Sequence, residues 1–166
     1  CGTTIDFTIH ITANEGSWGD TFSLTVGQVI PGGTITVFSE NFDSVTPPAL
    51  PAGWTTQVIS GNAWNTYAGY SCSAPNVLRY PYHSTQAADS WAYTPGISLQ
   101  AGVVYVLNFN MRVASSSFPE NLEVKIGTAP NNTDQTILIW SQNNITNTTC
   151  ELQSPTFTVP TSGTYY

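Results

Sequence analysis

Residues 3–12 alternate between apolar and polar side chains, which is the pattern of a half-buried β-strand. Residues 21–26 alternate in the same way, and the polar sequence at 14–17 predicts a turn between the two segments. The apolar positions are Ile5, Phe7, Ile9, Ile11, Phe22, Leu24 and Val26. We therefore expect a β-hairpin over residues 1–33, ended by Pro31-Gly32-Gly33.

From residue 34 to residue 166 the chain predicts a second, larger β-unit. Short strand-like segments are separated by clusters of Gly, Pro, Asn and Ser, and no segment of useful length has helical periodicity. The longest segment places Val103, Tyr105, Leu107, Phe109, Met111 and Val113 on one face. The expected strands are 34–38, 91–94, 103–113, 122–126, 136–141, 157–159 and 164–166. The fold class is therefore all-β, with a sandwich or jelly roll after the hairpin.

Composition limits the partners of the chain. Charged residues make up 8 % of its 166 residues, the net charge is −7, and only three residues are Lys or Arg. Nucleic acid binding depends on several cationic side chains that neutralise phosphates, so we expect no nucleic acid partner. The same scarcity argues against an anionic membrane surface, and no apolar run approaches the roughly 20 residues of a membrane span.

Three cysteines occur, Cys1, Cys72 and Cys150, and no two have the C-x-x-C spacing of a zinc or thioredoxin-like site. Cys72 and Cys150 both lie in polar, loop-like sequence, and we expect them to form a disulfide. Two unpaired buried thiols are the alternative. Cys1 pairs with a residue outside this sequence, or it is an N-terminal lipid-bearing cysteine.

Motifs in residues 40–166 resemble the cleaved adhesin, or choice-of-anchor J, jelly-roll domain, a MAM-like module of large secreted bacterial proteins. The matching stretches, in order, are ENFDS, LPAGW, AWNTYAGYS, VLRYPY, DSWAYTPGISLQAGVVYVLNF, ENLEVKIGTAPN, NITNTT and FTVPTSGTYY. The resemblance implies a jelly roll that lacks its last strand here. The first part of the chain resembles the final hairpin of an immunoglobulin-like domain.

A hairpin alone is marginally stable, and a jelly roll without one strand leaves an edge unpaired. Further sequence of the same polypeptide supplies the missing pieces, or another copy supplies them by donor-strand addition. The second alternative would make the chain a subunit of a fibre.

Catalytic machinery is not indicated by the sequence. Neither His10 nor His83 lies in a pattern typical of a nucleophile and its base. The ten acidic residues lie in turn-rich or solvent-facing sequence, and no pair stands out as a glycosidase pair. We therefore expect a protein that is not an enzyme.

Calcium binding explains acidic side chains in irregular loops better than catalysis does, because this hard cation takes six to eight oxygen ligands. The resembled family carries a structural calcium near the start of its jelly roll, where Glu40 and Asp43 match the location. Asp89 is a further candidate ligand. We expect a structural calcium site, with Glu40 as its principal ligand.

Aromatic residues are dense in this chain, and flat rings with polar rims can stack on sugars. Trp54 and Trp91 match fixed family positions and are expected in the core. The candidate ligand-binding residues are Trp64, Tyr70, Tyr80 and Tyr82. Three sequons, at Asn131, Asn144 and Asn147, are glycosylation sites if the source organism modifies asparagine.

The leading hypothesis is a non-catalytic, extracellular or cell-surface module of an adhesin-like protein that binds protein or glycan on a surface. One alternative is a subunit of an extracellular fibre that binds copies of itself by strand exchange. Another is an accessory domain of a secreted hydrolase.

Overall fold

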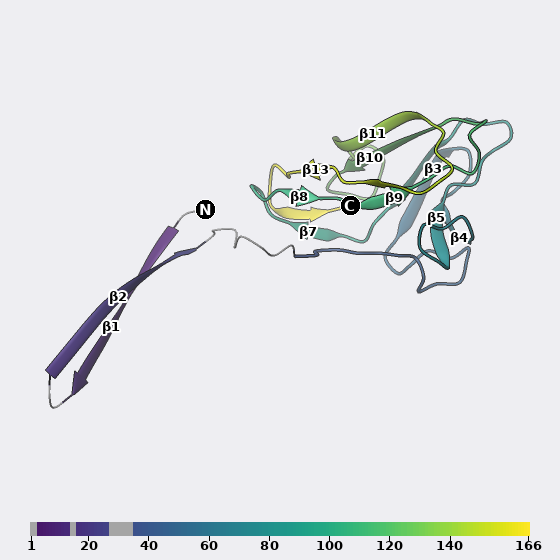
Figure 1. Cartoon of the computed structure of the whole chain (residues 1–166). Helices are drawn as coiled ribbons and strands as arrows, with labels where there is room; N and C mark the ends of the chain where they lie inside the picture. Colours follow the sequence, from purple (N-terminus) through teal and green to yellow (C-terminus); the bar gives the residue numbers. More distant parts are fainter. Residues whose placement is uncertain (1–2, 14–15, 27–34) are drawn as a thin grey trace. The chain divides into compact units, whose positions relative to one another are not determined.

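The computed structural model describes the backbone of residues 3–13 and 16–26, and both backbone and side chains of residues 35–166. The chain divides into two compact units, Cys1–Thr36 and Val37–Tyr166, which are considered separately (Figure 1). Residues 33 and 34, where the sequence places the boundary, lie outside the described residues. So do Cys1 and two residues of the expected turn, Asn14 and Glu15.

The first unit contains the hairpin that the alternation predicts. Strand β1 (Thr3–Ala13) pairs antiparallel with β2 (Gly16–Val26), and Thr3 lies opposite Val26. Both strands are longer than the alternating segments from which they were predicted. Within the described residues, this sheet has only these two strands.

The second unit is also built from antiparallel strands, and its described residues form no helix. It follows that no helix of the described chain is long and apolar enough to cross a membrane. The all-β prediction is confirmed. The strands are β3 (Thr55–Ser60), β4 (Asn65–Ala68), β5 (Asn76–Arg79), β6 (Asp89–Tyr93), β7 (Ile97–Leu99), β8 (Tyr105–Val106), β9 (Phe109–Met111), β10 (Glu120–Ile126), β11 (Ile137–Ile145), β12 (Glu151–Gln153), β13 (Thr156–Phe157) and β14 (Gly163–Tyr165).

Two of the predicted strands differ from the structure. Residues 35–38 form no strand, so the prediction for 34–38 is wrong over its described part. Ile35 is 84 % exposed and pairs with no strand among the described residues. The long strand expected at 103–113 is split into β8 and β9. At the break, the Leu107 amide donates to the Pro155 carbonyl at 2.9 Å, and proline has no N–H with which to return the bond.

The inward face expected for residues 103–113 is present from Tyr105 to Val113, whereas Val103 is 39 % exposed. Met111 and Val113 are buried, while Val104 and Val106 on the opposite face are 65 % and 53 % exposed. The period-2 alternation of a strand therefore persists through the break.

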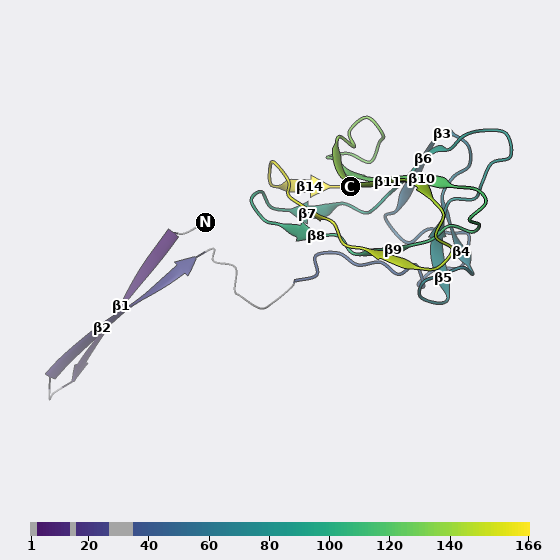
Figure 2. The same ribbon diagram turned by 45° about the horizontal axis from the view of Figure 1, so that its top comes forward.

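The main core lies around the C-terminal strand. Strand β14 pairs with β7. Just beyond β10, the Tyr166 amide donates to the Gly127 carbonyl, and the Gly127 amide donates to the Tyr166 carbonyl. Figures 1 and 2 both show the C-terminal end between β7 and the β10–β11 hairpin. The buried side chains of this core are Leu99, Ile126, Val159 and Tyr165, with Tyr105 and Phe157 packed against them.

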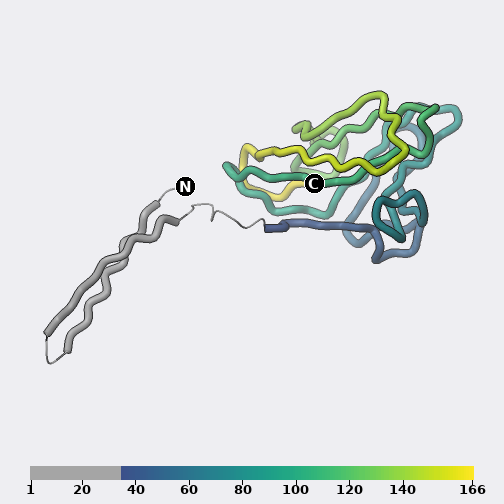
Figure 3. The backbone as a smooth tube through the Cα atoms, in the orientation of Figure 1, coloured from purple at the N-terminus to yellow at the C-terminus, as the bar shows by residue number. Residues whose placement is uncertain are grey.

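A second core cluster joins β9 to β11. Its buried members are Met111, Val113 and Ile145, and the Phe109 and Trp140 rings meet edge to face at 5.2 Å between centroids. The short β4–β5 hairpin forms a compact loop at one end of the unit (Figure 3). This end carries the exposed aromatic residues described next.

Candidate ligand-binding site

The β4–β5 hairpin places a tyrosine beside an arginine. Asn65 lies opposite Arg79 in the register of this hairpin, and Tyr67 lies opposite Val77. The guanidinium carbon Cζ of Arg79 lies 4.0 Å from the centroid of the Tyr67 ring, which is a cation–π contact. The two short strands therefore fix one half of an aromatic and cationic cluster.

Tyr70 extends this cluster into solvent. Its ring lies nearly parallel to that of Tyr67, with 6.2 Å between centroids and 17° between planes. Tyr70 is 59 % exposed, and its φ of 57° lies in the left-handed region that bulky side chains avoid. Such a conformation costs roughly 1–3 kcal/mol, and residues that adopt it are concentrated at functional sites.

The preceding residue makes the close approach to Tyr67 feasible. Gly69 has a φ of 135°, and a Cβ atom at this position would lie 3.1 Å from Cε1 of Tyr67. A larger residue would press on that ring in a backbone conformation that L side chains rarely adopt. Glycine at position 69 thus lets the Tyr67 and Tyr70 rings lie together.

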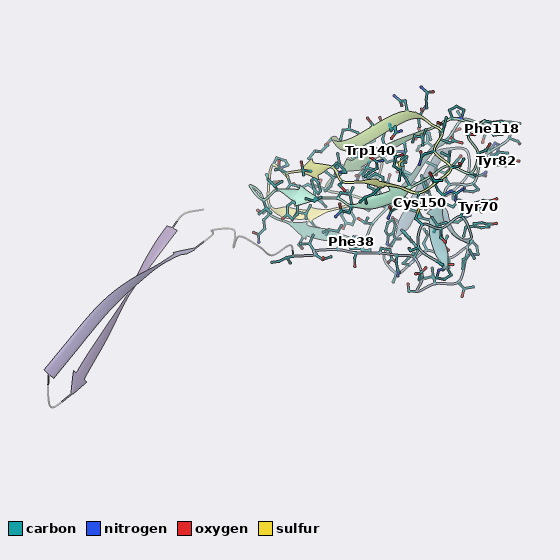
Figure 4. All side chains as sticks on the ribbon, viewed as in Figure 1. Phe38, Tyr70, Tyr82, Phe118, Trp140 and Cys150 are labelled. Carbon is teal, nitrogen blue, oxygen red and sulfur yellow. A yellow bond between two sulfur atoms is a disulfide. The ribbon has the colours of Figure 1, made fainter. Side chains whose placement is uncertain are left out.

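Arg112, which follows β9, completes the cluster from the other part of the unit. Its Cζ atom lies 5.3 Å from the centroid of the Tyr70 ring. We call Tyr67, Tyr70, Arg79 and Arg112 the tyrosine–arginine stack. Figure 4 shows Tyr70 at the end of the unit that carries β4 and β5.

The disulfide between Cys72 and Cys150 joins the two sides of the stack, and its presence confirms the predicted pairing. The bridge ties the loop that follows Tyr70 to the loop before β12. That second loop is fixed near Arg112, because the Val113 amide donates to the Asn147 carbonyl at 2.8 Å. The covalent link therefore holds Tyr70 close to Arg112.

The other predicted ligand-binding residues lie differently. Trp64 and Tyr80 are half-buried and pack on each other, with 5.7 Å between ring centroids. The Trp64 indole donates to the Ser90 carbonyl at 2.9 Å. The Asn62 amide donates to the Tyr80 hydroxyl. Tyr82 is 81 % exposed. Trp64 and Tyr80 thus have structural partners, whereas Tyr70 and Tyr82 face solvent.

Trp54 and Trp91, expected in the core, are both half-buried. Trp54 packs against Phe42, with 5.1 Å between ring centroids. The Trp91 ring lies parallel to the Tyr93 ring, with 6.2 Å between their centroids. The Lys125 ammonium lies 5.6 Å from the centroid of the Trp91 ring. These contacts are those of packed residues at the edge of a core.

Glu40 and Asp43, the expected calcium ligands, lie in one turn. A Glu40 carboxylate oxygen accepts from the Phe42 amide at 2.6 Å, and an Asp43 oxygen accepts from the Asn76 amide at 3.0 Å. The buried Asn76 side chain donates to the carbonyls of Phe42 and Val45, which fixes the turn.

Next to this turn is a cavity of about 220 Å³ whose lining includes Glu40, Asn41, Asn108 and Asn110. Carboxylate and amide oxygens of this kind fit part of a calcium shell. Asp89 does not join them: it pairs with Ser60 in the β3–β6 sheet and accepts from the Trp91 indole at 2.9 Å. Among the described residues, no three acidic, His or Cys side chains form a metal-binding group.

The three sequon asparagines have different surroundings. Asn131 caps its own turn by accepting from the amides of Thr133 and Asp134. The Asn147 side chain donates to the carbonyls of Met111 and Thr149. Asn144 is exposed, and its side chain makes no hydrogen bond within the described part of the chain.

Sequence reasoning did not identify Tyr67, Arg79 or Arg112 as site residues. The available signal was the scarcity of cations, since two of only three basic side chains lie on neighbouring tyrosines. His83, the histidine whose side chain is described, accepts from the Gln86 amide within its own loop.

Comparison with protein-family models, with curated proteins and with solved structures found no match, so the jelly-roll resemblance stays an expectation from sequence motifs.

Proposed function

We propose that this chain is a secreted or cell-surface binding module, without catalytic activity, that attaches to glycan or protein on a surface. The observation that carries the proposal is Tyr70, a largely exposed ring held in a strained backbone conformation beside Arg112. Backbone strain opposes folding, and an exposed ring gains little burial energy to offset it, so a residue that combines the two is a candidate for function.

The disulfide supports the proposed location. Disulfides persist in oxidising environments such as the extracellular space and are rare in the reducing cytosol. The Cys72–Cys150 bridge also lies next to Tyr70 in sequence, so the same environment that preserves the bridge preserves the geometry of the stack.

The test is a binding screen of the full chain against arrays of glycans and of extracellular matrix proteins. We expect a retained ligand whose binding falls at least about tenfold in Tyr70→Ala. The matched control is Phe118→Ala, because Phe118 is an aromatic residue that is 73 % exposed and outside the stack. Equal binding by both variants would show that the stack is not the site.

A second candidate, a fibre subunit joined by strand exchange, is favoured by the sheet edges. Within the described residues, β6 pairs only with β3 and β10 only with β11. Strand β14 pairs with β7, and Tyr166 bonds to Gly127, so β14 is directed toward the region between β6 and β10. A strand inserted in that region in the direction of β14 would run antiparallel to both β6 and β10.

The donor in this second candidate is β1 of another copy, which would exchange its pairing with β2 for pairing with β6 and β10 and whose alternating sequence suits a strand. Electron microscopy and sedimentation at increasing concentration distinguish the candidates. Regular fibres that are lost when Phe7→Asp interrupts the apolar positions of β1 would support strand exchange. Discrete monomers at all concentrations would exclude it and leave the binding module.

A further inference from the structure

No carboxylate among the described side chains, those of residues 35–166, neutralises the arginines of the tyrosine–arginine stack. Among the described residues the one ion pair joins Lys125 to Glu123, at 2.7 Å, so neither Arg79 nor Arg112 has a carboxylate partner. This is unexpected in a chain with ten acidic residues and a net charge of −7. Two half-buried cationic side chains beside the exposed Tyr70 thus have no described counter-charge.

The hydrogen-bonding capacity of these guanidinium groups is also largely unused. Arg112 makes one long hydrogen bond, from Nε to the Val113 carbonyl at 3.5 Å, and its terminal nitrogens bond to no described residue. Arg79 donates from Nη2 to the Asn65 side chain at 3.4 Å, and its buried Nε has no partner among the described residues. A guanidinium fork with free donors matches the two oxygens of a carboxylate.

Tyr70 adds a second recognition element to the charge. Tyr70 is 59 % exposed, so part of it stays open to solvent beside its contacts with Tyr67 and Arg112, and this part can pack against the C–H face of a pyranose. A sugar placed on Tyr70 would therefore bring a carboxylate substituent within reach of Arg112. A neutral sugar would contact only the Tyr70 ring, and a small free anion would contact only the Arg112 guanidinium.

The overall charge of the chain favours this combination over simple anion binding. A protein of net charge −7 repels polyanions at long range, and salt screens that repulsion over about 8–10 Å. An anionic ligand is retained only through short-range contacts that combine stacking with a charge-assisted hydrogen bond. Phosphate-rich polymers, which bind through many cations, do not fit two arginines.

We propose that the tyrosine–arginine stack binds an acidic sugar, that is, a pyranose bearing a carboxylate, with the ring on Tyr70 and the carboxylate on Arg112. This proposal rests on the proposed binding function and names its ligand class. Uronic acids and sialic acids share this chemistry and are separate arms of the test. The disulfide supports both contacts by joining the loop after Tyr70 to the loop before β12, and this second loop is hydrogen-bonded to Val113, the residue next to Arg112.

The experiment is calorimetric titration of the full chain with matched ligands. Trigalacturonate and 3′-sialyllactose are each compared with their own methyl esters, which have the same rings without the charge. We expect one acidic member to bind at least about tenfold more tightly than its neutral counterpart, and that member identifies the source.

Variants then assign the contacts. Arg112→Gln should remove the preference for the acid while leaving the weak binding of the neutral sugar, and Arg112→Lys should restore part of the preference. Tyr70→Ala should weaken acidic and neutral sugars alike. Phe118→Ala should change neither, and thermal melting of each variant confirms that it is folded.

Equal affinity for acidic and neutral sugars, or an unchanged preference in Arg112→Gln, would overturn the acidic-sugar proposal. If binding of another ligand still depended on Tyr70, the proposed binding function would survive that result. If no sugar bound and the arrays also gave no Tyr70-dependent ligand, both proposals would fail.

Discussion

Gln57 and Asn132 bond to each other through two hydrogen bonds, although they are 75 residues apart in the chain. The Gln57 side-chain amide donates to Oδ1 of Asn132 at 3.0 Å, and the Asn132 backbone amide donates to Oε1 of Gln57 at 2.8 Å. The same Gln57 oxygen accepts from the hydroxyl of the buried Tyr93 at 2.9 Å. One side chain thereby joins β3, β6 and the loop between β10 and β11.

Replacement of Gln57 by Ala should lower the free energy of unfolding by about 2 kcal/mol, because it leaves the Tyr93 hydroxyl and the Asn132 amide without partners. Urea denaturation measures this change. Gln100→Ala, at an exposed position, is the control and should be nearly neutral. A loss for Gln57→Ala no greater than that for Gln100→Ala would contradict the assigned role.

High pH should destabilise the protein through Tyr93. Burial raises the pKa of Tyr93, and the nearby Asp89 carboxylate raises it further. The unfolded chain then loses this proton at about pH 10, before the folded chain does. The contribution to stability is complete below about pH 10 and is lost as the pH rises through the folded pKa.

Urea denaturation at a series of pH values above about 9 tests this prediction. The free energy of unfolding should fall less steeply with pH in Tyr93→Phe than in the unmodified chain. Tyr82→Phe removes an exposed hydroxyl and should keep the steeper slope. Identical slopes in all three proteins would show that Tyr93 does not titrate differently on folding.

The sequence was informative about local strands and poor about long-range contacts. Alternation predicted β1 and β2, and it predicted the buried face that includes Met111, because period-2 burial is a local property. It missed β4 and β5, which are four residues each and too short to show a period. The Tyr70–Arg112 contact could not be predicted, since pairing of distant loops depends on the whole fold.

Loss of the disulfide should destabilise the second unit strongly. A bridge between residues 78 apart restricts the unfolded chain, and loop-closure entropy gives roughly 4.5 kcal/mol for such a loop. In a Cys1→Ser background, replacement of both Cys72 and Cys150 by Ser should lower the free energy of unfolding by about that amount. Reductant should produce the same loss in the parent protein and none in the variant.

Calcium at about 1 mM should raise the melting temperature if the turn of Glu40 and Asp43 binds the ion, since extracellular sites bind in this concentration range. Glu40→Gln removes one charged ligand and should reduce the shift. Glu151→Gln, at an exposed position in β12, is the charge-matched control. A shift of the same size in Glu40→Gln and in the unmodified chain would eliminate Glu40 as a ligand.

The small number of basic side chains limits where trypsin can cleave the chain. Trypsin cleaves after Lys and Arg, and the chain offers it only Arg79, Arg112 and Lys125. Each is half-buried with its cationic group on an aromatic ring, and Arg79 and Lys125 also lie within strands. Cleavage therefore requires opening of the fold, so the rate of tryptic digestion reports how often the second unit unfolds.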